Sequence, residues 1–336
     1  MAQDDPLRLC EQLNFVESLR KVWIEGPTTW WTSGIYSLGI GLRKMLAIGR
    51  RTPLNLMSDH GVTFGMNDFL LEVARQRRVP NLYLTWFEGQ VDWYASQGEV
   101  SDLDVIGCPH PYPFLRVGMR DRFGLGDGCL GFIPHGLGGE ELNRVASEQL
   151  LLDWSSLPKS IAPRAVCLSH HEMSQDTVDL FVSRGFPVVS AGNPNSPWFA
   201  HRFYKIISQF KMLTSPVFGS QLCLGTEAGL TCFMFGTWPE SDVMKSEALL
   251  SSFKRQTGVE WQDDTSLWLE AIDVFSDSKL QHSKRSLLSS YLLGEQFADS
   301  LGAIRQSVLE AARPSLGSWL RAGQHLGRSV AGPRSR

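Results

Sequence analysis

The chain has 336 residues, of which 43% are hydrophobic and 20% are charged, and its formal net charge at pH 7 is -3. This length allows two domains with separate cores, and the composition is typical of a globular protein. Because nucleic-acid binding usually needs a strongly basic face, the net charge gives no reason to expect a nucleic-acid partner.

The cysteines and the apolar runs indicate a cytoplasmic protein. The N-terminal sequence MAQDDPLRLC lacks the apolar region of a signal peptide, and no stretch approaches the roughly 18 uninterrupted apolar residues of a membrane span. The 6 cysteines form no C-x-x-C pair, and most lie in apolar runs that are expected to be strands or strand ends. Buried free thiols in a reducing compartment are therefore expected, rather than disulfides or zinc ligands.

The first half of the chain is predicted to contain a mainly parallel sheet. Residues 1–50 are expected to form an extension with one or two short helices. Its Gly39-Ile40-Gly41 segment lacks a preceding strand and a third glycine, which argues against a dinucleotide site. After it, short apolar runs alternate with helix-length crossovers, as in α/β proteins. The predicted strands are residues 54–58, 81–86, 104–108 and 129–134.

A second unit is predicted after a boundary marked by Pro158 and Pro163, which follow helix and linker sequence. It consists of strand 165–168, a helix that Ser174 caps and Gly185 ends, and strand 187–191. Such a strand–helix–strand unit is expected to form a right-handed crossover.

The stretch 201–236 predicts a helix, a strand, a tight turn, a second helix and a second strand. Ser220 is predicted to be the N-cap of the second helix, and Gly219 before it would let a ligand approach the backbone closely. A strand, a Gly-Ser turn and a helix N-terminus together can bind a phosphate group.

The expected architecture is an α/β fold with two Rossmann-like domains facing each other across a cleft, followed by a helical C-terminal region. The expected divisions are the extension 1–50, a first domain 51–157, a second domain 158–240 and the helical region 241–336.

Polar side chains follow the predicted strands at their carboxyl ends, where ligands bind in parallel α/β sheets. Asp59 could equally cap the next helix, and His110, beside proline, could be a turn residue. The repetition nevertheless favours a polar cleft. The side chains in question are Asp59, His60, Glu88, His110, His135, His170, His171 and Asn193.

Metal and hydrolase chemistry are not expected. The pair Asp102 and Asp104 has the D-x-D pattern of a divalent-ion site, but it lies at the start of a predicted strand, the wrong end of the sheet. The segment His170-His171-Glu172 lacks the i, i+4 spacing of a helical zinc site. No G-x-S-x-G nucleophile motif occurs.

Three segments carry a family resemblance: FIPHGLGG at 132–139, AVCLSHHEMSQDTVDLFVSRGFPVVSAGN at 165–193 and RFYKIISQFKMLTSPVFGSQLCLGTEAGLTCFMFG at 202–236. They resemble glycosyltransferases of the GT-B architecture and, more distantly, the UDP-N-acetylglucosamine 2-epimerases that share it. Within that group the chain looks like the surface-polysaccharide biosynthesis proteins encoded in bacterial capsule or O-antigen clusters.

The resemblance implies that the second domain binds a nucleotide-sugar donor. By this resemblance Ser215, Gly219 and Ser220 would hold the phosphates of the donor. Glu227 is a weaker candidate near the donor's sugar or ribose, and His170 is a further donor-binding candidate. The donor is a substrate, and no cofactor or metal is expected.

The leading hypothesis is a metal-independent transferase that moves a sugar from the donor to a glycan or lipid-linked acceptor. A lipid-linked acceptor would bring this cytoplasmic protein into peripheral contact with the inner face of the membrane. A nucleotide-sugar epimerase is one alternative. A catalytically silent nucleotide-sugar-binding protein of an assembly complex is another.

Sugar transfer with inversion needs a base that takes the proton from the attacking hydroxyl. His135 and Asp59 are the first candidates by position, because both follow strands of the first half. Glu88 ranks behind them. It follows Trp86 and Phe87, where desolvation would favour the protonated form of a carboxyl group.

Overall fold

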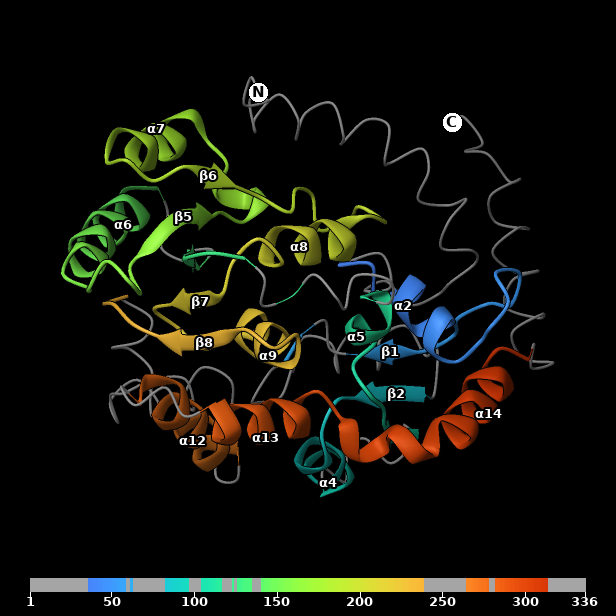
Figure 1. The fold of residues 1–336 in the computed structure, drawn as a ribbon. Coiled ribbons are helices and arrows are strands. Elements are labelled where there is room, and N and C mark those ends of the chain that lie inside the picture. The colour runs from blue at the N-terminus through green and yellow to red at the C-terminus, as the bar shows by residue number, and fades with distance from the viewer. Residues whose placement is uncertain are drawn as a thin grey trace, which may run out of the picture.

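The computed structural model describes residues 36–58, 61–62, 82–96, 104–116, 123, 126–134, 140–238, 264–277 and 282–313. These residues form a parallel α/β fold with two separate sheets (Figure 1). The predicted α/β class is thereby confirmed. The three-stranded sheet has the order β1-β2-β3, with β1 at Met57–Ser58, β2 at Leu82–Thr85 and β3 at Asp104–Gly107.

The five-stranded sheet has the order β6-β5-β4-β7-β8, and all neighbouring strands in it are parallel. The chain runs outward from β4 to β6 and then returns to β7 on the other side of β4. This is the strand order of a doubly wound Rossmann-like sheet. The strands are β4 (Cys129–Phe132), β5 (Pro163–Cys167), β6 (Val188–Val189), β7 (Met212–Ser215) and β8 (Thr231–Met234).

The expectation that the strand at 129–134 belongs to the sheet of the first half is wrong. This strand is β4, the central strand of the five-stranded sheet, where it pairs with both β5 and β7. Helix α6 (Glu140–Ser155) is the crossover from β4 to β5. A helix followed by prolines is expected both in a crossover within one sheet and in a linker between two domains, so the sequence alone does not distinguish them. Pro163 in fact begins β5, where a strand tolerates proline.

Close packing joins α6 to β4. Trp154 of α6 is fully buried, and its indole Nε1 donates a hydrogen bond to the carbonyl oxygen of Phe235 at 3.1 Å. A Cβ atom at Gly131 in β4 would collide with the Trp154 ring. The glycine therefore lets the indole lie directly on the sheet.

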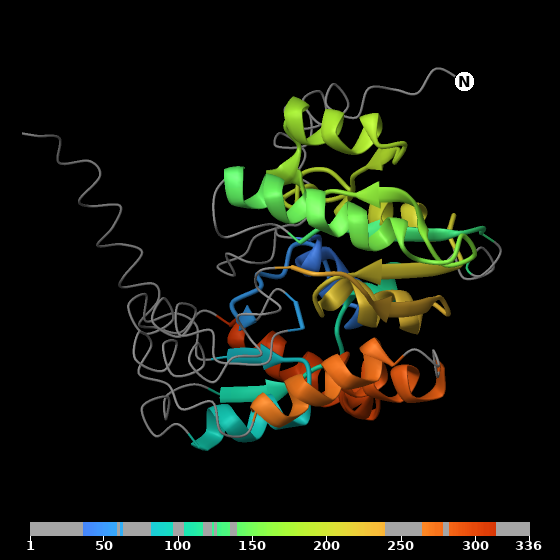
Figure 2. The ribbon, with the colours of Figure 1, turned by 90° about the vertical axis from the view of Figure 1, so that its left-hand side faces the viewer.

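Side chains of the five-stranded sheet alternate between its faces, as the strand period requires. On one face, Val166 and Leu168 pack with α6 and with α7 (Gln175–Ser183). On the other face, Ala165 and Cys167 pack in a core that includes α8 (Phe199–Ile207) and α9 (Ser220–Glu227). The predicted cap of α7 is confirmed, because the Ser174 hydroxyl accepts a hydrogen bond from the Thr177 backbone N–H. Figure 2 shows α6 and the C-terminal helices on opposite sides of these strands.

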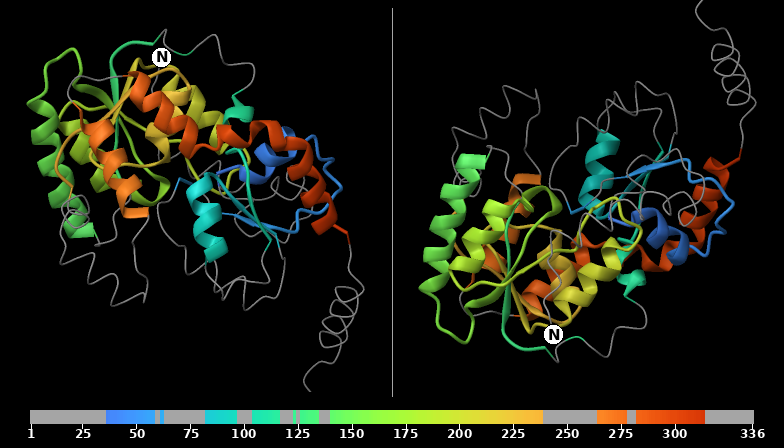
Figure 3. Two further views of the ribbon diagram at one scale, coloured as in Figure 1. Left: turned by 90° about the horizontal axis from the view of Figure 1, so that it is seen from below. Right: turned by 90° about the horizontal axis from the view of Figure 1, so that it is seen from above.

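The C-terminal region is helical, as predicted, within the residues that are described. Helices α12 (Asp264–Ser276), α13 (His282–Leu292) and α14 (Leu301–Ala311) run in succession from the five-stranded sheet to the three-stranded sheet (Figure 3). Hydrogen bonds tie them to the first half. The Leu293 carbonyl oxygen accepts from the His110 backbone N–H at 2.8 Å, and the Ala311 carbonyl oxygen accepts from the Asn55 side chain at 3.2 Å.

Helix α2 (Leu38–Met45) contains the Gly39-Ile40-Gly41 segment, which serves helix packing. A Cβ atom at Gly41 would lie 2.9 Å from Cβ of Pro111, just before α5 (Tyr112–Leu115). Because Gly41 has no side chain, α2 can approach α5 closely. The segment is part of a helix, and it does not form a phosphate-binding turn.

The described cysteines are free and buried, as predicted, whereas Cys10 lies outside the described residues. Burial raises the pKa of the Cys167 and Cys232 thiols to about 12, so they stay protonated at neutral pH. Within the described ranges, no helix is both long enough and apolar enough to cross a membrane.

Candidate functional site

A pocket of about 390 Å³ lies where strands of both sheets end at their carboxyl side. Segments that follow β4, β5, β6 and β7 line it from the five-stranded sheet, and segments that follow β1 and β3 line it from the three-stranded sheet. Its volume is in the range of small-molecule sites, roughly 300–1,000 Å³. Residues that line it include Gly61, Val62, His110, Tyr112, Ile133, Pro134, Ser169, His170, Ser190, Gly192, Phe218 and Gly219.

The strand order explains why a pocket forms here. After β4 the chain turns toward β5, whereas after β7 it turns toward β8, so the connections diverge in opposite directions. Ile133 and Pro134 leave β4 on one side of the resulting gap, and Val217 and Phe218 leave β7 on the other. Ligands of open α/β sheets bind at such a switch point.

The N-terminus of α9 opens into this pocket. Gly219 is its N-cap, and Ser220 and Gln221 are the first helical residues. Among the described residues, the backbone N–H groups of these three have no hydrogen-bond acceptor. Such N–H groups, together with the positive end of the helix dipole, form a binding site for an anion.

The prediction that Ser220 caps α9 is wrong by one residue, and the contact of its hydroxyl explains the difference. The Ser220 Oγ accepts a hydrogen bond at 2.8 Å from the backbone N–H of Val62, which follows β1. A Cβ atom on Gly61 would lie 2.7 Å from this Oγ. The hydroxyl therefore joins the loop after β1 to the first turn of α9, instead of capping the helix.

Ser215, predicted to contact the donor phosphates, lies beneath the turn that precedes α9. It is fully buried, and its Oγ accepts hydrogen bonds at 3.4 Å from the Val217 backbone N–H and from the Gln221 side-chain amide. Ser215 is not among the residues that line the pocket. Its position indicates that it shapes the turn that presents the α9 N-terminus.

Glu227 is the last residue of α9, at the end opposite Gly219, and it does not line the pocket. Its carboxylate forms an ion pair with the Arg116 guanidinium, which follows α5. The side chains of Arg116 and Glu227 are only 10% and 12% exposed. The structure therefore gives Glu227 a contact inside the protein rather than a place beside a ligand.

Of the other predicted site residues, one lines the pocket, one lies outside it, and two lie outside the described residues. His170 lines the pocket at the start of a short 3₁₀ helix, His170–Glu172, just after β5. Glu88 begins α4 (Glu88–Ser96), is exposed to solvent and does not line the pocket, so the burial expected beside Trp86 and Phe87 does not occur. His135 and Asp59 lie outside the described residues.

His110 lines the pocket, as expected for the set of strand-end polar residues, although by itself it could also have been a turn residue. Its side chain is 2% exposed, and its ring meets the Trp86 and Tyr112 rings edge-on, each with a centroid separation of 5.0 Å. Its Nδ1 accepts a hydrogen bond from the Tyr112 backbone N–H at 3.3 Å. Burial lowers the pKa of His110 to about 3, so the imidazole is neutral at physiological pH.

This buried imidazole predicts acid sensitivity. In the unfolded chain His110 takes up a proton below about pH 6.5, whereas the fold keeps it neutral down to a pKa of about 3. A lowered pKa in the fold means that stability is lost as the pH falls through this window. By pH 5 the loss should be about 2 kcal/mol. Urea unfolding at pH 7.5 and pH 5 should show this loss in the natural protein and a smaller one in His110→Phe. Equal losses in both proteins would contradict it.

The chemical character of the pocket is neutral and aromatic. Among the described residues that line it there is no Lys, Arg, Asp or Glu, and its polar groups are backbone amides, hydroxyls, the Gln221 amide and the imidazoles of His110 and His170. No group of three metal-ligating side chains occurs in the described part of the chain. The aromatic lining residues are Tyr36, Tyr112, Phe132, Phe199, Phe203 and Phe218.

No protein-family model matches the chain, and no curated protein matches it. The function is therefore inferred from the pocket.

Proposed function

We propose that this protein is a metal-independent glycosyltransferase of the GT-B type, which transfers a sugar from a nucleotide-activated donor to a glycan or lipid-linked acceptor of a surface polysaccharide. The observation that supports this proposal is the pocket at the switch point of the five-stranded sheet, with the N-terminus of α9 in its wall and the carboxyl ends of a second parallel sheet contributing to it.

The donor diphosphate would bind at the N-terminus of α9. An anion at an exposed helix N-terminus typically gains about 0.3–1 kcal/mol from the helix dipole. The N–H groups of Gly219, Ser220 and Gln221 would add hydrogen bonds to the charged phosphates, each worth about 1.5–3 kcal/mol. The surrounding side chains are uncharged and largely aromatic, and a low local dielectric strengthens such hydrogen bonds. The same groups would stabilise the charge that develops on the diphosphate as it leaves.

The acceptor would approach from the three-stranded sheet. In the transfer step the acceptor oxygen forms a bond to the anomeric carbon, the bond from that carbon to the phosphate oxygen breaks, and a base takes the hydroxyl proton. His135 comes directly after Pro134, and Asp59 stands two residues before Gly61; Pro134 and Gly61 both line the pocket. This adjacency in the chain supports His135 and Asp59 as the candidate bases.

Calorimetry with a panel of UDP-, GDP-, CDP- and CMP-linked sugars, followed by turnover assays with the sugars that bind, tests the proposal. The expected result is binding of one nucleotide type and transfer of its sugar to a saccharide or lipid-linked acceptor. Binding without transfer would favour the silent binding protein, and interconversion of the donor would favour the epimerase. Absence of binding across the panel would contradict a nucleotide-sugar function.

Substituting Gly219 by valine is expected to weaken donor binding by about tenfold or more, since losing even one hydrogen bond to a charged phosphate costs roughly 1.5–3 kcal/mol. Gly219 is extended, with φ at -176°, so a side chain causes no backbone strain. The three atoms nearest to its Cβ would all belong to the end of the flexible Gln221 side chain, which can move, so the fold should stay intact. Calorimetry on Gly219→Val measures the effect.

Gly302→Val is the matched control, because Gly302 lies on α14 with open space around it and does not line the pocket. It should bind the donor as the natural protein does. Unchanged donor affinity in a folded Gly219→Val variant would place the phosphates elsewhere.

A further inference from the structure

The segment after β3 contributes two pocket-lining residues that each carry an unpaired buried polar atom. Nε2 of His110 and the phenolic oxygen of Tyr112 are buried and have no hydrogen-bond partner among the described residues. The two side chains are only 2% and 4% exposed, and both line the pocket. An unpaired buried polar group costs about 1–3 kcal/mol, and about 90% or more of such groups in proteins are paired. Two of them on contacting side chains of residues that line one pocket therefore point to a ligand that pairs with them.

The hydrogen bond at Nδ1 of His110 determines whether its Nε2 atom donates or accepts a hydrogen bond with that ligand. Its Nδ1 accepts a hydrogen bond from the Tyr112 backbone N–H, so the proton of the neutral ring is on Nε2. The free ring atom is therefore a donor, and it has no lone pair with which to take a proton. His110 can bind an oxygen atom, but in this tautomer it cannot be the base that deprotonates an acceptor.

Tyr112 offers a hydroxyl that donates one hydrogen bond and accepts others. Burial raises the pKa of Tyr112, and the neighbouring phenols of Tyr36 and Tyr204 raise it further, so the group is uncharged. A neutral N–H donor beside a neutral hydroxyl complements the hydroxyl groups of a ligand. A charged ligand group would be left without a counter-charge in this aromatic wall, which is costly.

The wall around this pair is aromatic. Tyr36 packs edge-on against Phe199 with ring centroids 4.8 Å apart, and Tyr112 packs against Phe203 at 6.4 Å. All of these residues line the pocket. A ligand part with C–H surfaces between its hydroxyl groups fits both the rings and the unpaired polar atoms. That combination is the chemistry of a sugar ring.

We propose that His110 and Tyr112 form a subsite for an uncharged sugar ring, with His110 Nε2–H as hydrogen-bond donor and the Tyr112 hydroxyl as its partner group. The proposal rests on the proposed function, because it assigns one part of the same pocket. The ring belongs either to the nucleotide sugar or to the acceptor glycan, and both present the same hydroxyl chemistry.

The subsite is held rigidly, which reduces the cost of binding. The His110 backbone N–H donates to the Leu293 carbonyl oxygen at 2.8 Å, and the imidazole edge rests against the Trp86 ring. Gly294, with φ at +76°, allows this contact, because a Cβ there would lie 2.7 Å from the Cys108 carbonyl oxygen. The connection after α13 thus holds the His110 backbone in place.

The test uses Tyr112→Phe, which deletes one atom, and His110→Phe, which keeps a ring but loses the donor. His110→Gln, which restores an N–H donor, is the conservative variant. The hydroxyl of Tyr112 is unpaired in the free protein, so Tyr112→Phe should not lower the melting temperature. Calorimetry would compare the tightest-binding nucleotide sugar of the panel, the same nucleotide without its sugar, and methyl glycosides of glucose, galactose, mannose and N-acetylglucosamine.

The two Phe variants are expected to weaken binding of a sugar-bearing probe by about tenfold, with unchanged affinity for the bare nucleotide and partial recovery in His110→Gln. Weaker binding of the nucleotide sugar would assign the subsite to the donor's sugar, and weaker binding of a methyl glycoside alone would assign it to the acceptor. Both results support the subsite. If the natural protein binds glycosides but no nucleotide sugar, the transferase proposal fails, and a loss of glycoside binding in the variants still supports the subsite. Unchanged binding of every sugar probe in the variants, or no sugar binding by the natural protein, would overturn the proposed subsite.

Discussion

Substituting Arg116 by leucine is expected to lower the free energy of unfolding by about 3–5 kcal/mol, because it removes the guanidinium that pairs with the largely buried Glu227 carboxylate. The ion pair connects the end of α5 with the end of α9, and the Arg116 guanidinium also lies over the Phe123 ring at 5.5 Å. Urea unfolding of the purified variant measures the loss.

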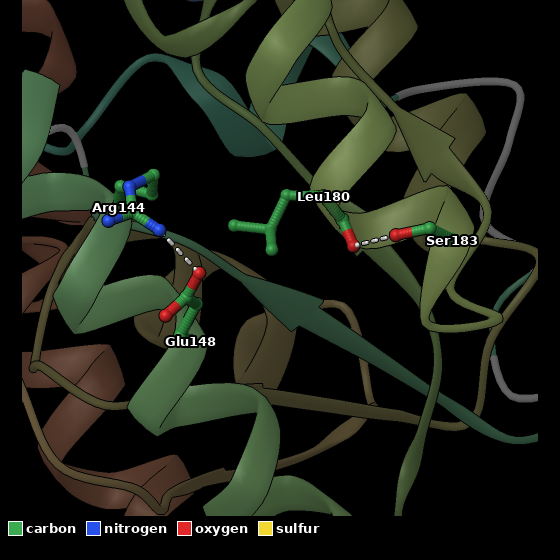
Figure 4. A network of polar contacts seen from close by, with 4 residues as sticks. All are labelled: Arg144, Glu148, Leu180 and Ser183. Carbon is green, nitrogen blue, oxygen red and sulfur yellow. Dashed lines mark hydrogen bonds and ion pairs between the residues drawn. The ribbon is translucent and has the colours of Figure 1, made fainter.

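The double variant Arg116→Leu with Glu227→Leu should recover much of that loss, since removing both charges also removes the cost of burying one alone. Arg144→Leu is the matched control. Arg144 pairs with Glu148 at 2.7 Å on the exposed face of α6, where the side chains are 53% and 39% exposed (Figure 4). Breaking an exposed pair should cost no more than about 1 kcal/mol. Equal losses for Arg116→Leu and Arg144→Leu would contradict the buried role of the first pair.

Under the proposed function, removal of the proposed catalytic base is expected to lower turnover by about a hundredfold or more, with donor binding retained. The variants are His135→Ala and Asp59→Asn, whose positions adjoin the pocket lining in the chain. Donor binding is measured by calorimetry and turnover by release of the free nucleotide. One of the two variants should show the loss in turnover without a matching loss in affinity.

His201→Ala is the control for the histidine, because His201 is exposed on α8 and does not line the pocket. Glu88→Gln completes the series, and its exposed position outside the pocket predicts a smaller effect. Near-normal turnover in His135→Ala, Asp59→Asn and Glu88→Gln alike would show that the base is another group.

The strands could be predicted from the sequence because each is a short apolar run between turn residues. The run at 104–108 is strand β3 at Asp104–Gly107, and the first strand predicted within 201–236 is β7 at Met212–Ser215. The sheet to which a strand belongs could not be predicted in the same way. Residues 129–134 follow three strands of the first half, yet β4 pairs with β5 and β7 through contacts that are remote in sequence.

Site residues could be predicted where their position follows directly from the end of a strand. Gly219 at a strand-to-helix turn and His170 after a strand both line the pocket, as strand-end positions in a parallel sheet should. Side-chain partners were not predictable. The Ser220 hydroxyl binds the Val62 N–H and the Glu227 carboxylate binds Arg116, and both contacts join segments that are far apart in the chain.

His110 was named among the strand-end residues of the expected cleft but was given no role in the site, and Tyr112 was missed. His110 follows a strand in the same way as His170, but the prolines beside it also fit an ordinary turn. What distinguishes it is deep burial together with an unpaired Nε2 atom, and both arise from the packing of Trp86 and Tyr112 around the ring. The spacing of residues in the sequence does not predict such packing.

The most direct test of the proposed function is a crystal structure of the protein soaked with the nucleotide sugar that binds most tightly in the calorimetric panel. The expected result is a diphosphate or phosphate within hydrogen-bond distance of the backbone N–H groups of Gly219, Ser220 and Gln221, at the N-terminus of α9. A nucleotide sugar bound away from this helix end, or a pocket that stays free of it at saturating concentration, would contradict the proposal.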